Sequence, residues 1–224
     1  SPSLPPFPVS GLISYWKLDE VSGSKATDSS DSNPGSASFT AITTGKIGSA
    51  RSFGTGASYL NITNAANISF TGDFSITAWI SMNAGGIITA KLDSDSGGGY
   101  AMILGNNGEV YCRTSYGTGY NDSYTNSFGV IGVDRVATGT WTHIAVVRSG
   151  TSCRVYINGV DKTNTTASHS LTSNSLPLRL GARSGTTFPD SFFGVIDETG
   201  IWNRALTAPE ITNLYNGGSG NTYP

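Results

Sequence analysis

Charged residues are scarce in this chain of 224 residues: Asp, Glu, Lys and Arg together make up 12% of it, and the formal net charge is −2. A nucleic-acid-binding domain concentrates Lys and Arg on one face, whereas the cations here are few and scattered. The chain also lacks an apolar run approaching the ~20 residues of a membrane-spanning helix. We therefore expect neither a nucleic-acid partner nor a membrane span.

Glutamate is rarer still and occurs only at Glu20, Glu109, Glu198 and Glu210. A glycoside hydrolase needs two carboxylates on the same substrate, ~5.5 Å apart for retention or ~6.5–9.5 Å apart for inversion. Asp197 and Glu198 are adjacent, so they should point to opposite faces of a strand and cannot share a substrate. No Ser–His–Asp signature with a nucleophile elbow is present either. The sequence therefore predicts no enzyme.

The chain has two cysteines, Cys112 and Cys153. In a meander these residues would lie two strands apart in one sheet, beyond the ~7 Å Cα separation that a disulfide tolerates. We favour two small buried hydrophobic residues, with a stabilising bridge as the alternative. The two histidines also have no metal-ligand spacing: His143 should pack on a strand, and His169 should be solvated in a Ser/Thr-rich loop.

What the chain has in abundance is glycine, with 29 residues, beside many Ser, Thr and Asn. Short apolar segments alternate with turn signals at intervals of roughly ten residues, which is typical of a β-sandwich. In residues 74–82 one face carries Phe74, Ile76, Ala78 and Ile80 and the other is largely polar. Further strands are predicted over residues 11–20, 85–91, 100–105, 109–115, 141–148, 152–158, 176–180 and 192–202. A polar loop is expected over residues 21–37, and Asp93–Gly97 should be a solvated turn.

The only convincing helix is predicted over Ala208–Tyr215. Thr207 is its expected N-cap, Pro209 stands early, and Glu210 completes a capping box. Before the domain, residues 1–10 are proline-rich and predict a stiff linker; residues 11–218 form one domain, and residues 219–224 a tail. We take the chain to be a piece of a larger secreted or cell-surface protein, tethered to other domains and monomeric in isolation.

The segment from Tyr116 to Phe128 is the candidate ligand site. We expect it to be irregular, as part of a long connection from Tyr116 to Ala137, and long loops in compact domains are usually functional. Tyr and Asn combine rigid aromatic faces with adaptable hydrogen bonding, which suits the C–H faces and hydroxyl edges of a sugar. The predicted ligand-binding residues are Tyr116, Tyr120, Asn121, Asp122 and Tyr124. The alternative is that some of these aromatic rings fold inward and anchor the loop. The ligand site would then lie elsewhere, on the concave sheet around Tyr111 and Arg113.

Several segments, in this order, resemble the strands of laminin G-like, concanavalin A-type jelly-roll domains. The strongest is Gly194–Leu206, an apolar run with Asp197 and Glu198 in its middle, followed by the capped helix. The other segments are residues 11–20, 45–53, 59–60, 74–80, 139–148 and 155–159. The resemblance implies an all-β fold, a two-sheet antiparallel jelly-roll β-sandwich with one short C-terminal helix. It also implies that Trp16, Trp79, Trp141 and Trp202 pack in the core.

The resemblance further implies a structural calcium ion that joins the start of the chain to its end. Calcium takes ~6–8 oxygen ligands, and the loop from Asp28 to Gly35 is rich in oxygen. The implied ligands are Asp28 and Asp197, with Asn33 and Asp19 as weaker members of the set. The alternative is that Asp28 caps a turn and that Asp197 pairs with an arginine such as Arg51.

A binding module is therefore the leading functional expectation. It would be a non-catalytic, lectin-like domain that binds a polysaccharide or other glycan outside the cell. Because laminin G-like domains also bind proteins, a protein-binding, adhesion or structural module remains the alternative. The fold by itself does not choose between them.

Overall fold

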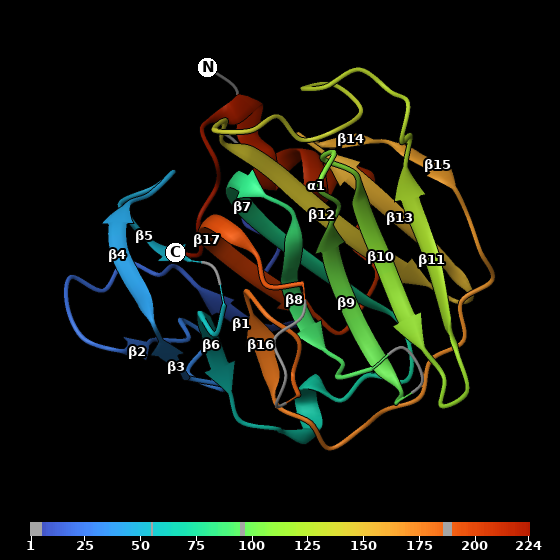
Figure 1. The fold of residues 1–224 in the computed structure, drawn as a ribbon, viewed down its shortest axis with the longest axis horizontal. Helices are drawn as coiled ribbons and strands as arrows, with labels where there is room; N and C mark the ends of the chain where they lie inside the picture. The colour runs from blue at the N-terminus through green and yellow to red at the C-terminus, as the bar shows by residue number, and fades with distance from the viewer. Residues whose placement is uncertain (1–5, 55, 95–96, 186–189) are drawn as a thin grey trace.

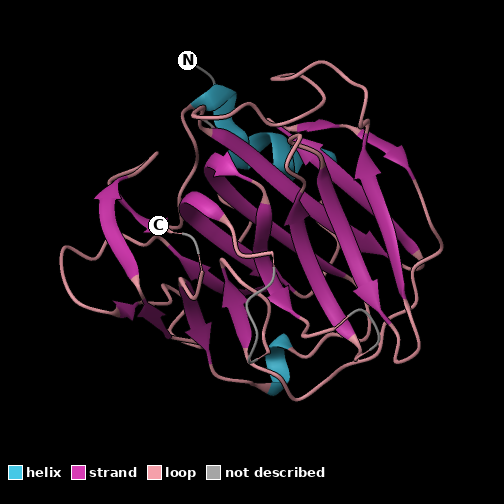
Figure 2. Ribbon diagram, viewed as in Figure 1, coloured by secondary structure: helices cyan, strands magenta, loops and turns pink. Residues whose placement is uncertain are grey.

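A computed structural model describes residues 6–54, 56–94, 97–185 and 190–224. Two large antiparallel sheets pack face to face and enclose the hydrophobic core (Figures 1 and 2). Across the described residues, no helix is both long and apolar enough to cross a membrane. The predicted two-sheet jelly-roll β-sandwich is therefore confirmed.

The first sheet contains the strands that carry most of the family-like segments. Its order is β14 (Val160–Asp161), β13 (Ser152–Ile157), β12 (Thr142–Ser149), β7 (Phe74–Ala84), β17 (Phe193–Trp202), β5 (Ser49–Phe53) and β4 (Thr40–Thr44), with β1 (Leu12–Trp16) also paired to β17. Inward residues of β7 alternate as predicted, because Phe74, Ile76, Ala78 and Ile80 all lie in the main core.

The second sheet lies in front in Figure 1. Its order is β15 (Thr163–Thr165), β11 (Tyr120–Thr125), β10 (Val110–Ser115), β9 (Gly99–Leu104), β8 (Gly86–Lys91), β16 (Leu178–Leu180), β6 (Tyr59–Ile62), β3 (Gly35–Ser38) and β2 (Lys25–Ala26). Thus β2 and β3 lie within the expected polar loop. A short 3₁₀ helix, η1 (Ala66–Ile68), joins β6 to β7.

The prediction of an irregular segment from Tyr116 to Phe128 was wrong at its centre, where β11 forms. This polar sequence becomes a strand because it pairs with β10 on one side and with β15 on the other. Backbone pairing satisfies its amides and carbonyls, so weak intrinsic β-propensity is overridden by the neighbouring strands.

The two cysteines are joined in a disulfide, so the expectation of two unpaired residues was wrong. Cys112 is on β10 and Cys153 on β13, and these strands belong to opposite sheets. Both side chains point into the sandwich, where their Cα atoms lie 6.3 Å apart. The error came from placing both strands in one sheet.

Helix α1 (Ala208–Tyr215) begins with the predicted capping box between Thr207 and Glu210 and ends at Asn216, where the short helix η2 (Asn216–Gly218) follows. It packs over the outer face of the first sheet, where Trp79 stacks on Tyr215 with ring centroids 5.8 Å apart. Trp79 is therefore buried beneath the helix. Trp16 and Trp202 are also buried, whereas Trp141 is half-buried.

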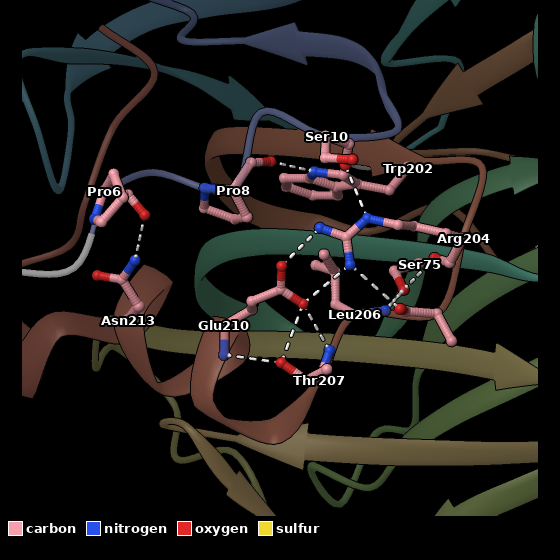
Figure 3. A network of polar contacts seen from close by, with 11 residues as sticks. Pro6, Pro8, Ser10, Ser75, Trp202, Arg204, Leu206, Thr207, Glu210 and Asn213 are labelled. Carbon is pink, nitrogen blue, oxygen red and sulfur yellow. Dashed lines mark hydrogen bonds and ion pairs between the residues drawn. The ribbon is translucent and has the colours of Figure 1, made fainter.

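The described part of the predicted linker packs against the domain instead of extending away from it (Figure 3). The carbonyl oxygens of Pro6, Pro8 and Ser10 accept hydrogen bonds from Asn213 Nδ2, Trp202 Nε1 and Arg204 Nε. Phe7 is buried against aromatic rings that include Tyr223 of the predicted tail, with centroids 5.7 Å apart. Residues 1–5, like Asp95 and Ser96 of the predicted solvated turn, lie outside the described residues.

Candidate ligand-binding groove

One face of the β10–β11 hairpin carries a continuous row of aromatic and charged side chains. In the strand register Tyr111 lies opposite Tyr124, and Arg113 lies opposite Asp122. Alternate residues of a strand share a face, so these four side chains project together from the sheet, away from Cys112 and the core. We call this set, with Tyr120, the tyrosine–arginine plate.

The plate is held together by specific contacts. The rings of Tyr111 and Tyr124 stack with centroids 4.9 Å apart and an interplanar angle of 29°. Arg113 binds Asp122 through two hydrogen bonds, Nε to Oδ1 at 2.9 Å and Nη2 to Oδ2 at 2.7 Å. The Arg113 guanidinium also lies over the ring of Tyr120, 4.0 Å from its centroid. Because each planar group orders the next, the plate is preorganised.

A groove of about 330 Å³ adjoins the plate at the β9–β10 end of the second sheet. Ile87, Ile103 and Leu104 give it apolar lining, and Asn106, Tyr111, Arg113, Arg183 and Asp190 give it polar groups. The lining residues are Gly85, Gly86, Ile87, Ile103, Leu104, Gly105, Asn106, Tyr111, Arg113, Arg183 and Asp190. Its volume falls at the lower end of the range for small-molecule sites.

Glycine at position 85 allows the two walls of this groove to approach each other. A Cβ atom at Gly85 would lie 2.5 Å from the Leu104 carbonyl oxygen and from the Gly105 carbonyl carbon. Real Cβ atoms do not come so close to backbone, so any other residue would push the β7–β8 turn away from the β9–β10 hairpin. Local backbone geometry thus sets the width of the groove.

Both cations that line the groove are paired with carboxylates. Arg113 pairs with Asp122, and Arg183 Nη2 lies 3.2 Å from Asp190 Oδ2. Burial, followed by the nearby Glu109, raises the pKa of Tyr111, so its hydroxyl stays protonated and can both donate and accept hydrogen bonds. The groove therefore offers many hydrogen-bonding groups without a strong charge of one sign.

The structure brings together only part of the predicted ligand set. Tyr120, Asp122 and Tyr124 lie on the plate, as described above. Asn121 instead accepts a hydrogen bond from the Ser170 backbone at 3.1 Å, and Tyr116 lies in the β10–β11 turn beside Gly119. Whether the predicted residues bind a ligand stays a prediction.

Most of the groove was missed by sequence reasoning. Tyr111 and Arg113 were predicted only as the alternative site on the concave sheet, and both line the groove. Arg183 and Asp190 follow β16 and carry no local signal, because only the tertiary fold places them beside β8 and β9.

The predicted calcium ligands fall into two pairs, each of which holds a turn. Asp28 accepts hydrogen bonds from the backbone amides of Tyr15, Ser30 and Asn33, at 2.8, 2.9 and 2.8 Å. Asn33 in turn donates through Nδ2 to Ser14 Oγ at 2.8 Å. This buried pair is satisfied by protein groups, as the turn-capping alternative for Asp28 describes.

Asp19 and Asp197 both bind the turn of residues 45–49. Asp19 Oδ1 accepts from the Ser49 amide at 2.7 Å, and Asp197 Oδ2 accepts from the amides of Lys46 and Ile47 at 2.8 and 3.0 Å. Arg51, the other proposed partner of Asp197, donates instead to the carbonyls of Gly23 and Lys25. A Cβ at Gly48 would lie 2.1 Å from Asp19 Oδ1, so glycine is required for this close approach.

Glu198 is a further buried acid near Asp19 and Asp197 that was not among the predicted calcium ligands. The strand register shifts between Asp197 and Gly200, and Glu198 has a left-handed φ of 47°, so simple alternation is interrupted. Tyr15 Oη donates to Glu198 Oε2 at 2.6 Å, whereas the buried Oε1 has no hydrogen-bond partner. Burial raises the pKa of Asp197 to about 8 and that of Glu198 to about 7. Within the described residues the carboxylate oxygens of Asp19, Asp197 and Glu198 do not all lie within 4.8 Å of one another, so the three acids do not form a ready-made cation site.

His169 was predicted to be solvated but is buried between the sheets, with 1% of its surface exposed. Its ring nitrogens contact the hydroxyls of Thr114 and Ser123 at 2.9 and 2.8 Å. It also lies beside Cys112 and Cys153. Within the described ranges, these three form the one group of His, Cys, Asp or Glu residues whose potential metal-ligand atoms all lie within 4.8 Å of one another. Because the two sulfurs are bonded to each other, we assign this cluster a structural role.

A model of the concanavalin A-like lectin/glucanases superfamily matches residues 53–212. The chain belongs to this superfamily. The match spans the plate, the groove and the start of helix α1, so these features are built on the family's scaffold. No similar sequence was found among the curated proteins.

Similar solved structures come from several different proteins. Domain 4 of AbnA, an extracellular arabinanase from Geobacillus stearothermophilus, in complex with arabinotriose, is 23% identical with a TM-score of 0.69, and the alignment covers 90% of this chain and 97% of that one. The binding domain of Paraclostridial Mosquitocidal Protein 1 is 19% identical with a TM-score of 0.70, over 93% of this chain and 52% of that one. Trypanosoma rangeli sialidase is 15% identical with a TM-score of 0.68, over 96% and 35%. At these identities the likeness shows the fold alone.

Proposed function

We propose that this domain is a non-catalytic module that binds a neutral glycan in the groove beside the tyrosine–arginine plate. The observation that carries the proposal is the juxtaposition of stacked tyrosine rings, apolar lining residues and two arginine–carboxylate pairs. Sugars combine apolar C–H faces with hydroxyl edges, which such a surface matches. Arabinotriose in the similar arabinanase domain supports the choice of ligand class.

Paired charges favour a neutral ligand over an acidic one. Arg113 and Arg183 already bind Asp122 and Asp190, so an anionic sugar would have to compete with these carboxylates. The same pairing argues against hydrolysis, because a general acid or a nucleophile must be free to exchange protons or to attack. Hydroxyl groups, by contrast, can add hydrogen bonds without breaking either ion pair.

A glycan array followed by calorimetry tests the proposal. We expect binding to neutral oligosaccharides, with arabinotriose as one member of the panel. Replacing Tyr111 with Ala should weaken binding at least about tenfold, or about 1.4 kcal/mol, because it removes half of the stacked pair. Tyr116→Ala is the matched control, since this tyrosine lies off the plate, and should leave the affinity unchanged. Failure of the wild-type domain to bind any neutral glycan would overturn the proposal.

We also propose that a structural calcium ion binds at Asp19 and Asp197, which hold the same turn of residues 45–49. Burial raises the pKa of Asp197 to about 8, and a cation beside this carboxylate would offset that cost, which supports the proposal. When bound, the ion would supply positive charge that keeps these carboxylates ionised. It would also tie the 45–49 turn and β1 to β17, so its role would be stability and not chemistry.

Thermal unfolding with and without chelator tests the calcium site. We expect chelation to lower Tm, and Asp197→Asn to remove this dependence. Asp28→Asn is the discriminating control, because it should lower Tm but keep the response to calcium. If instead Asp28→Asn alone abolishes the response, the site lies at the Asp28–Asn33 loop.

An extracellular location is part of the same proposal. The buried Cys112–Cys153 disulfide supports it, because such bonds persist mainly in oxidising compartments. We infer that the domain is tethered within a larger protein and is monomeric when isolated. Light scattering of the purified domain checks the second point.

A further inference from the structure

The connection between β11 and β12 displays an apolar surface that the fold does not use. Phe128 is 96% exposed, Val130 63%, Ile131 59% and Val133 50%. In Figure 1 this yellow-green connection projects beyond the ends of the strands. Single exposed apolar side chains are ordinary, whereas several together mark an interaction site.

Polar contacts fix the backbone of this loop and leave the apolar side chains outside. Asp134 accepts from the Val130 amide at 3.1 Å through Oδ2 and pairs with Lys162 at 3.1 Å. Arg135 Nε donates to the Gly129 carbonyl at 2.8 Å. Because these contacts hold the loop in a defined conformation, its apolar side chains are held in an exposed position.

This loop packs against the hairpin that walls the groove. The Val136 amide donates to the Gly108 carbonyl at 2.7 Å, and Arg135 Nη1 contacts the Asn107 carbonyl at 3.4 Å. A second hollow of about 200 Å³ lies here, lined by residues that include Met82, Asn106, Asn107, Ile131, Arg135 and Thr138. Asn106 also lines the groove, so the two hollows share a lining residue and are neighbours.

We propose that the second hollow and the apolar loop form a further subsite, so that the ligand is a neutral glycan chain and not a single terminal sugar. The chain would run from the groove past Asn106 and lie along Ile131 and Arg135. The Asn106 amide can donate to one sugar and accept from another, while Ile131 covers an apolar C–H face. This inference rests on the proposed function, because it extends the same site.

Two connected subsites predict a dependence on ligand length. A sugar bound in the groove holds its linked neighbour at high effective concentration over the second hollow, so affinity should rise as the chain grows into it. Calorimetry with arabino-, xylo- and cello-oligosaccharides of two to eight units measures this dependence. We expect Ile131→Ser to weaken binding of the longer oligosaccharides roughly tenfold, or about 1.4 kcal/mol, and to leave di- and trisaccharide binding unchanged.

Val21→Ser is the matched control, since Val21 is 87% exposed and lies in the β1–β2 connection. This variant should bind every length as the wild type does. Affinity that does not increase beyond the shortest bound oligosaccharide overturns the subsite while the glycan-binding function stands. An equal loss at all lengths in Ile131→Ser also overturns it, because the residue would then shape the groove itself. No binding at any length removes both proposals.

Discussion

His169 shows how burial changes the protonation of one residue. Burial lowers its pKa to about 4, with Arg148 adding to the effect and Asp122 opposing it. The neutral ring fits between the hydroxyls of Thr114 and Ser123, each of which can rotate to donate or accept. Protonation would therefore place a charge in the interior.

A pH titration of unfolding tests this arrangement. The pKa of His169 is lower in the folded than in the unfolded chain, so the unfolded state binds the proton first and stability falls as the pH drops from about 6.5 towards 4. Acidification from pH 7 to pH 4.5 should lower the free energy of unfolding of both proteins. We expect the decrease to be about 2–3 kcal/mol smaller in His169→Asn than in the wild type. Equal slopes for the two proteins would mean that the pKa of His169 is the same in the folded and unfolded states, which would contradict this prediction. His143, whose pKa burial lowers to about 3, titrates in both proteins and does not affect the comparison.

Helix α1 is fixed at the scale of one element by Arg204 and Glu210. Arg204 Nη2 lies 2.5 Å from Glu210 Oε1, and Thr207 donates its backbone amide to Glu210 Oε2 at 2.8 Å (Figure 3). Arg204 also donates a hydrogen bond to the carbonyl of Ser10, so one side chain binds both the N-terminal segment and the helix. Arg204, followed by the hydrogen bonds from Thr207, lowers the pKa of Glu210 to about 2.

Replacing Glu210 with Gln should therefore destabilise the domain in a pH-dependent way. A lowered carboxylate pKa contributes stability above its unfolded value of ~4.5 and loses it as the pH falls towards 2. Because the pair is partly solvated, we expect a loss of about 1–2 kcal/mol at pH 7 that vanishes near pH 2. Denaturant unfolding measures it. Arg154→Gln is the control, because Arg154 pairs with Asp161 at the exposed surface, and it should not change the free energy of unfolding measurably. An equal loss of stability in this control would mean that surface charge in general, and not the Arg204–Glu210 pair, causes the loss in Glu210→Gln.

At the scale of the whole molecule, the disulfide joins a strand of one sheet to a strand of the other. Cys112 lies on β10, between Tyr111 and Arg113 of the plate, and Cys153 lies on β13 of the opposite sheet. The bond closes a separation of 41 residues. It therefore both restricts the unfolded chain and supports the strand that presents the plate.

Replacing both cysteines with Ala should lower the free energy of unfolding by about 4 kcal/mol, as the chain-entropy relation gives for a loop of this length. Denaturant unfolding with and without a reductant measures the effect. The reductant should lower the free energy of unfolding of the wild type and leave that of the double variant unchanged. Identical stability of the oxidised wild type and the variant would show that the bridge restricts neither state.

The sequence predicted features that depend on short stretches of chain. The alternation of Phe74, Ile76, Ala78 and Ile80 identified an inward face, and Thr207 with Glu210 located the start of helix α1. Both signals reflect periodicity or capping within a few residues. The order of such segments was enough to predict the family and the two-sheet fold, which the match over residues 53–212 confirms.

Only the tertiary structure decided which distant residues meet. Cys112 and Cys153 can bond because their strands face each other across the sandwich, and Arg183 reaches the groove because β16 lies beside β8. The strand register shifts between Asp197 and Gly200, which interrupts the alternation that the sequence implied. Strand order, register and sheet assignment arise from long-range pairing and burial, and no local pattern along the chain encodes them.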